Sequence, residues 1–178
     1  MHMKRLFDCL DHQLANFPKK DMLAAKEKGI WKTYSTADVA STVNDLSAGL
    51  LSLGVSGHNF TPESSDKIAI MSSNRPEWVF TDLACQQIGA ILVPLYPTTN
   101  PIEVEFILND AAVGYVFVSN LELYEKVKSV ASKVPSIKGI YTFDAIEGAV
   151  HWTSITKAST PALLDQVASI KKTIPVPS

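Results

Sequence analysis

The segment 96–99 carries the side chains best suited to line a ligand site. Its residues Tyr96, Pro97, Thr98 and Thr99 directly follow the apolar run 90–95, which predicts a buried strand. Open parallel sheets bind their ligands at the carboxyl ends of strands, so a phenol and two hydroxyl groups at that place could contact a substrate. The same residues would also serve as an ordinary lead-in to the next helix, and the sequence leaves both interpretations open.

Four polar residues stand at the starts of predicted helices: Ser35, Asn74, Asn100 and Asn120. The three asparagines also follow predicted strands, where backbone N–H groups and the helix dipole could receive an anion. The sequence has neither a GxGxxG nor a GxxxxGK[ST] pattern. Without such glycines the backbone cannot approach a pyrophosphate closely. We therefore interpret all four residues as structural helix caps.

Patterns that would mark a catalytic or metal centre are missing from the sequence. There is no GxSxG nucleophile motif, and the acidic residues are scattered along predicted solvent faces. The four histidines form no HxH or HxxxH pair, and the two cysteines, Cys9 and Cys85, lie far apart. Cys85 stands among apolar residues and is predicted to be a buried free thiol. We predict no catalytic residue and no metal site in this chain.

The composition is that of a folded protein without an obvious charged partner. The 178 residues are 46% hydrophobic, and 16 basic against 18 acidic residues give a net charge of −2, which does not favour nucleic acid binding. No run of 18 apolar residues is present, and the first 16 residues lack the apolar core of a secretory signal. These features predict a cytoplasmic protein.

Hydrophobic periodicity and turn residues predict alternating strands and helices. The chain opens with a helix over 5–15 and a hairpin of two strands, 22–25 and 30–34. The expected later strands are 67–71, 90–95, 115–118 and 137–143, and the expected later helices begin near residues 35, 74, 100, 120 and 161. Strands that are apolar on both faces indicate an α/β fold, with an open, largely parallel sheet and helices on both faces.

Three ordered stretches resemble one enzyme family. They are residues 30–35 with 46–55, residues 66–78, and residues 89–98. Their order and spacing are similar to the N-terminal part of adenylate-forming (AMP-binding) enzymes. The sequences Asn-Arg-Pro-Glu-Trp at 74–78 and Pro-Leu-Tyr-Pro-Thr at 94–98 most resemble long-chain fatty acid–CoA ligases, or acyl-CoA synthetases. The resemblance extends over about residues 5–178.

This resemblance implies a function for a larger parent protein. Such ligases activate a fatty acid with ATP and Mg²⁺ through an acyl-adenylate, and then transfer the acyl group to CoA. The family's phosphate-binding loop, its nucleotide motifs and its mobile C-terminal lid have no counterpart in these 178 residues. The resemblance thus describes residues 1–178 as a partial N-terminal domain that stops before the phosphate-binding loop, with residues 171–178 as an extended linker.

The resemblance also implies partners and one candidate site. The partners would be the remainder of the ligase chain, the fatty acid and CoA, with segment 96–99 near the tunnel for the pantetheine arm of CoA. Long-chain members can form homodimers through their N-terminal segment, here residues 3–17, and can contact membranes peripherally. Two rival hypotheses remain: a freestanding α/β module that binds a small anion or nucleotide, and a non-catalytic dimerisation domain.

Overall fold

The computed structural model describes residues 4–27 and 29–176, and the chain divides into two compact units. One unit comprises residues 1–55, 75–89 and 155–178 and is mostly helical, and we call it the helical unit. The other comprises residues 56–74 and 90–154, contains the main sheet, and is called the sheet unit. The sequence was expected to form part of a single domain, so the division into two units is a finding of the structure.

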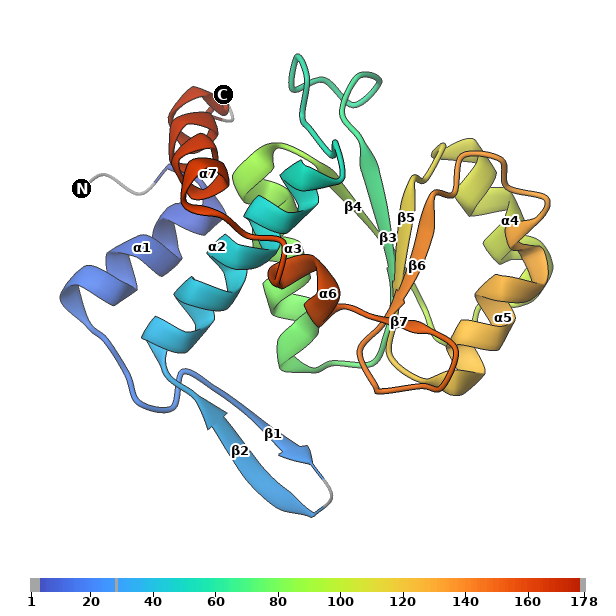
Figure 1. Ribbon diagram of the computed structural model, residues 1–178, viewed down its shortest axis with the longest axis horizontal. Helices are drawn as coiled ribbons and strands as arrows, with labels where there is room; N and C mark the ends of the chain where they lie inside the picture. The colour runs from blue at the N-terminus through green and yellow to red at the C-terminus, as the bar shows by residue number, and fades with distance from the viewer. Residues whose placement is uncertain (1–3, 28, 177–178) are drawn as a thin grey trace. The chain divides into compact units, whose positions relative to one another are not determined.

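The helical unit is arranged around α2 (Thr36–Ser52), which contacts α1 (Leu6–Asn16), α3 (Pro76–Ile88) and α7 (Pro161–Thr173). Apolar side chains at spacings of three and four residues on α2 are completely buried: Val39, Val43, Leu46 and Leu50. The predicted apolar face of this helix is therefore confirmed. The antiparallel hairpin of β1 (Leu23–Glu27) and β2 (Ile30–Tyr34) belongs to the same unit, and Figure 1 shows it extending away from α1 and α2.

The sheet unit contains five parallel strands in the order β4-β3-β5-β6-β7. Their bounds are β3 (Lys67–Met71), β4 (Ile91–Leu95), β5 (Tyr115–Val118), β6 (Gly139–Thr142) and β7 (Val150–His151). Helices α4 (Pro101–Asp110) and α5 (Leu121–Ala131) lie next to each other beside the sheet (Figure 1) and share a buried core with β3 and β5. The predicted α/β class with a parallel sheet is confirmed.

Strand β4 is more exposed than its apolar sequence predicts. Ile91, Leu92 and Val93 are half-buried and Pro94 is exposed. The reason is topological, because β4 lies at the edge of the sheet and pairs only with β3. Proline has no N–H to donate, so an edge strand is where it can be accommodated.

The C-terminal part of the chain differs from the prediction in four elements. Helix α7 continues through Thr173, so residues 171–173 are helical and do not belong to an extended linker. Lys171 and Lys172 favour this extension because cations stabilise the C-terminal turn of a helix. The short strand β7 and the single turn α6 (Thr153–Thr156) were not predicted, and β6 is shorter than expected. Among the described residues, no helix is both long and apolar enough to cross a bilayer.

Candidate functional site

The carboxyl edge of the sheet collects the polar residues that follow each strand. Ser72 follows β3, Ser119 follows β5, and both are buried. Backbone bonds join neighbouring strand ends: Ser119 N–H donates to Met71 over 3.2 Å, and Phe143 N–H donates to Val118 over 2.9 Å. The structure therefore brings together segments that the sequence analysis could relate only through the general rule for parallel sheets.

Segment 96–99 forms a turn at this edge, directly after β4. Thr99 N–H donates to the Tyr96 carbonyl over 3.0 Å, which closes the turn. The ammonium group of Lys126 on α5 donates to the carbonyls of Pro97 and Thr99, at 2.6 and 3.2 Å. Lys126 thus holds the backbone of the turn in place, while the Tyr96 side chain is 81% exposed and Thr98 is exposed. The turn presents a phenol and a hydroxyl outward on a held backbone.

Lys126 is a part of this arrangement that the sequence analysis missed. A lysine in the middle of a surface helix usually extends into water, so its residue type gives no signal. Only the packing of α5 beside segment 96–99 brings its ammonium group to the two carbonyls. The side chain acts on the backbone of the segment, whereas the sequence analysis considered the side chains of Tyr96, Thr98 and Thr99.

Three of the four residues interpreted as caps occupy N-cap positions. Ser35 accepts from Asp38 N–H at 3.1 Å, and the Asp38 carboxylate accepts from Ser35 N–H at 2.9 Å, which completes a capping box. Asn100 and Asn120 each accept, at 3.0 Å, from the N–H three residues later. These asparagine side chains therefore occupy helix N–H groups that an anion would otherwise contact.

Asn74 is not the cap of α3, and this prediction was wrong. The N-cap is Arg75, whose backbone is extended (φ −160°, ψ 162°). The residue before a proline is forced out of the helical region, so Pro76 at the first helical position shifts the boundary one residue towards it. The Arg75 guanidinium instead forms a two-point ion pair with Glu77, with distances of 2.8 and 3.1 Å.

His151 at the end of β7 is the histidine nearest to the sheet edge, and both of its ring nitrogens have partners. Nε2 lies 2.8 Å from the Phe143 carbonyl, and Nδ1 lies 2.7 Å from the Thr153 hydroxyl. A carbonyl only accepts, so Nε2 carries a proton and donates it there. This ring joins the end of β7 to the residue after β6 and is poorly placed to act as a general base.

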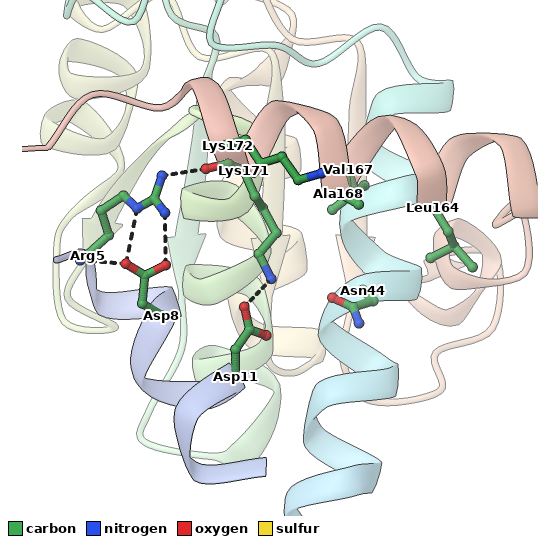
Figure 2. A pocket seen from close by; sticks show the side chains of 9 residues that line it. All are labelled: Arg5, Asp8, Asp11, Asn44, Leu164, Val167, Ala168, Lys171 and Lys172. Atoms are coloured by element: carbon green, nitrogen blue, oxygen red, sulfur yellow. Dashed lines mark hydrogen bonds and ion pairs between the residues drawn. The ribbon is translucent and has the colours of Figure 1, made fainter. Parts of the chain in front are cut away.

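A separate hollow of about 410 Å³ lies in the helical unit between α1, α2 and α7. Its apolar wall comes from α7, and its charges are largely paired, as Figure 2 shows. Arg5 is bonded to Asp8, with a closest contact of 3.0 Å between Nη2 and Oδ1, and its guanidinium also donates to the carbonyls of Lys171 and Ile174. Lys171 is bonded to Asp11 at the other side of the hollow.

Because the charges of this hollow are largely paired with each other, they indicate a structural role for it more than a role in ligand binding. Burial would raise the pKa of the Asp8 carboxyl, but hydrogen bonds from the Arg5 side chain and from the backbone N–H groups of Lys4 and Arg5 outweigh it and hold the pKa below 3.8. The sequence analysis missed this cluster because its partners lie about 160 positions apart in the chain.

The two cysteines and the possible metal ligands form no reactive group among the described residues. Cys85 is a completely buried free thiol, as predicted, and burial raises its pKa far above the ordinary value. Cys9 is a free thiol on the exposed side of α1. Within residues 4–27 and 29–176, no group of three or more histidine, cysteine, aspartate or glutamate residues is placed to hold a metal ion.

Comparison with curated proteins finds long-chain fatty acid ligases. Residues 10–174 match the family model of the AMP-binding enzyme. Human long-chain-fatty-acid–CoA ligase 6 is 31% identical over 129 residues, which is 70% of this chain and 18% of the human protein. Long chain acyl-CoA synthetase 4 of Arabidopsis thaliana is 28% identical over 151 residues, which is 81% of this chain and 21% of the plant protein. The chain spans about a fifth of the length of these curated relatives.

Solved structures agree with this assignment at the level of the fold. A long-chain-fatty-acid-CoA ligase from Archaeoglobus fulgidus superposes with a TM-score of 0.72 at 19% identity, covering 90% of this chain and 31% of that one. A putative long-chain-fatty-acid CoA ligase from Rhodopseudomonas palustris gives 0.68 at 26% identity, covering 84% of this chain and 35% of that one. Because the family model matches residues 10–174 of the 178, this chain belongs to the AMP-binding enzyme family.

Proposed function

We propose that this chain is the N-terminal scaffold portion of an AMP-forming long-chain fatty acid–CoA ligase and is catalytically incomplete by itself. The observation that carries the proposal is the family match over residues 10–174, because it joins the helical unit and the sheet unit in one assignment. The curated relatives named above are long-chain ligases, which supports a fatty acid as the carboxylate substrate. ATP, Mg²⁺ and CoA would then be used by the whole enzyme.

The geometry supports a positioning role for this portion, without a chemical step. The strand-end helices α4 and α5 already use an N-terminal N–H for their own caps, Asn100 and Asn120. The nearest histidine, His151, is occupied at both ring nitrogens. Neither feature favours the rival hypothesis of a freestanding anion-binding or nucleotide-binding module, which requires free donors at the sheet edge.

Within this proposal, segment 96–99 lines the passage for the pantetheine arm of CoA. The support is the exposed Tyr96 and Thr98 on a backbone that Lys126 holds in place. A rigid turn with outward hydroxyl and phenol groups can accept a long, partly polar chain without a rearrangement of its own. The homodimer through residues 3–17 and the cytoplasmic location stay predictions, and one curated relative, from Arabidopsis thaliana, is peroxisomal.

Isothermal titration calorimetry on the purified chain tests the proposal against its rivals. ATP, AMP and CoA are each titrated into the chain, and no saturable heat is expected, because the nucleotide-binding elements of the family are not among its residues. A micromolar dissociation constant for ATP or AMP would contradict the scaffold assignment and favour the freestanding module. Sedimentation velocity on the same sample tests the dimerisation hypothesis, which a monomer at all concentrations would exclude.

A further inference from the structure

The loop that leads into β3 is closed on itself by Asp66. Ser56 N–H donates to the Asp66 Oδ2 atom over 2.8 Å, and Asp66 N–H donates back to the Ser56 carbonyl over 3.0 Å. These bonds join the two ends of segment 56–66, which we call the entry loop and which forms the bends before β3 in Figure 1. The Asp66 carbonyl also accepts from Ile91 N–H at the start of β4, over 2.9 Å. Asp66 therefore connects the entry loop to both strands.

A histidine in the entry loop contacts the same carboxylate. His58 Nε2 lies 3.2 Å from Asp66 Oδ2, the oxygen that also accepts from Ser56 N–H. A carboxylate only accepts, so Nε2 carries a proton in this contact. The His58 side chain is 52% exposed, so its ring exchanges protons with the solvent. As the pH falls, the second ring nitrogen also takes up a proton and the contact becomes an ion pair.

The closed entry loop contains strained backbone that opposes these contacts. Phe60 has a φ of 57° and His58 a φ of 47°, in the left-handed region that a large side chain such as phenylalanine rarely adopts. Phe60 N–H and the Ser65 hydroxyl both donate to the Gly57 carbonyl, at 2.6 and 3.0 Å, and hold the turn in this conformation. Such backbone persists only where surrounding contacts maintain it. Strain therefore favours an open loop, and the bonds to Asp66 favour the closed one.

His58 is placed to decide between the two forms near neutral pH. The charged and titratable groups beside the pair are Glu63 in the loop, Lys67 on β3 and Tyr115 on β5, whereas β4 has no titratable side chain. Carboxyl, lysine and tyrosine groups ordinarily keep one charge state between about pH 5.5 and about pH 8. Burial, with the charge of Asp66 as a smaller cause, raises the pKa of Tyr115 and moves it further from this range. Among these groups, only the imidazole of His58 changes its charge there.

We propose that His58 and Asp66 form a pH-sensitive latch, which keeps the entry loop closed at acidic pH and lets it open more often above neutral pH. A charged imidazole forms a stronger hydrogen bond to the carboxylate than a neutral one does. The added stability of the closed loop is therefore present when His58 is protonated and is lost as the pH rises and the ring loses its charge. An opening that displaces Asp66 also loosens the bond to Ile91 at the start of the edge strand β4. This inference is independent of the proposed function, because it rests on contacts within the sheet unit.

Amide hydrogen exchange, followed by NMR on the whole 178-residue chain, tests the latch at about pH 5.5 and about pH 8. Protection factors are compared, because they remove the effect of pH on the intrinsic exchange rate. The reporters are the N–H groups of Ser56, Asp66 and Ile91. In the wild type, their protection factors are expected to be about threefold higher at the lower pH, the effect of a partly exposed ion pair. His58→Gln and Asp66→Asn are each expected to remove this difference between the two pH values.

His12→Gln on α1 is the matched control, because His12 belongs to the helical unit and its ring contacts Asn16. This variant is expected to keep the pH dependence of the wild type. The N–H of Val116, in the buried strand β5, reports on opening of the whole unit and should not change with His58. Equal protection at both pH values in the wild type, or a difference that persists in His58→Gln, would overturn the inference. A change at Val116 as large as that in the entry loop would do the same, because the pH dependence would then belong to the whole unit.

Discussion

The ammonium nitrogen of Lys126 lies 2.6 Å from the carbonyl oxygen of Pro97, across 29 positions of sequence. The same nitrogen is 3.2 Å from the Thr99 carbonyl, so one side chain of α5 holds two carbonyls of the turn after β4. Backbone carbonyls bonded to a cation form stronger hydrogen bonds than neutral pairs do. This contact makes segment 96–99 a fixed element of the sheet edge.

Replacement of Lys126 by methionine is expected to loosen this turn. The change keeps the aliphatic stem and removes both hydrogen bonds, and the half-buried setting gives a cost of about 1 kcal/mol in the free energy of unfolding. Amide hydrogen exchange at residues 96–99 should become faster, while exchange within β3 and β5 stays slow. The control is Lys128→Met on the same helix, whose contact with Glu125 is 3.8 Å long and exposed. Unchanged exchange at the turn in Lys126→Met would contradict the holding role.

Arg5 is expected to contribute more to stability than the exposed ion pairs do. Its guanidinium satisfies the buried Asp8 carboxylate and also donates to the carbonyls of Lys171, in the last turn of α7, and of Ile174, the C-cap of that helix. Arg5→Met should therefore lower the free energy of unfolding by about 2 kcal/mol, because it leaves a buried carboxylate without its main partner. In urea denaturation, Lys133→Met should cost about 0.5 kcal/mol or less, because the Lys133 side chain is largely in water and its partner Glu105 is only half-buried. Equal midpoints for the two variants would refute this ranking.

Asp8 should make the stability of the helical unit sensitive to acid. Hydrogen bonds to its carboxylate hold the pKa in the folded state below 3.8, so the ionised group stabilises the fold above that pH. This stabilisation is lost as the pH falls through the lower, folded-state pKa. Asp8→Asn should therefore destabilise the protein at pH 6, and this cost should shrink as the pH falls below 3.8 towards the folded-state pKa, as measured by urea denaturation. The exposed Asp165 gives a control, and Asp165→Asn should leave the pH dependence as it is in the wild type.

Gly49 in α2 is required for the approach of Ile155. A Cβ at position 49 would lie 2.7 Å from the Ile155 Cγ2 atom and would also collide with the Ile155 carbonyl group. Backbone cannot move aside as a flexible side chain can, so Gly49→Ala is expected to lower the melting temperature and to cost about 3 kcal/mol or more. Gly114→Ala is the control, since its Cβ would meet nothing closer than 3.9 Å. A Gly49→Ala protein as stable as the control would show that the two segments are not in contact.

The fold was largely predictable because its elements are marked by local rules. The apolar stripe of α2, the glycine after it and the apolar runs of β3 and β5 follow from the periods of helix and strand. The errors arose where a neighbour in space or in sequence decided the outcome. Pro76 shifted the start of α3 past Asn74, and pairing on one side only exposed β4. The spacing of apolar residues in the sequence predicts neither the start of α3 at Pro76 nor the position of β4 at the edge of the sheet.

The sequence placed segment 96–99 after a strand, and the structure shows it as a turn directly after β4. The rule for parallel sheets directed attention to this segment, and its role in ligand binding stays a prediction. Lys126 and the cluster of Arg5, Asp8 and Lys171 were missed, because each depends on contacts between segments far apart in sequence. Their residue types alone are those of ordinary surface charges.

The central claim is that this member of the AMP-binding enzyme family contains scaffold and no working centre. Fatty-acid-dependent exchange of pyrophosphate into ATP, measured with the purified 178-residue chain, Mg²⁺ and a long-chain fatty acid, tests it most directly. The account predicts exchange no faster than in a reaction without protein. Exchange that rises in proportion to the concentration of the chain, and that stops when the fatty acid is omitted, would contradict it.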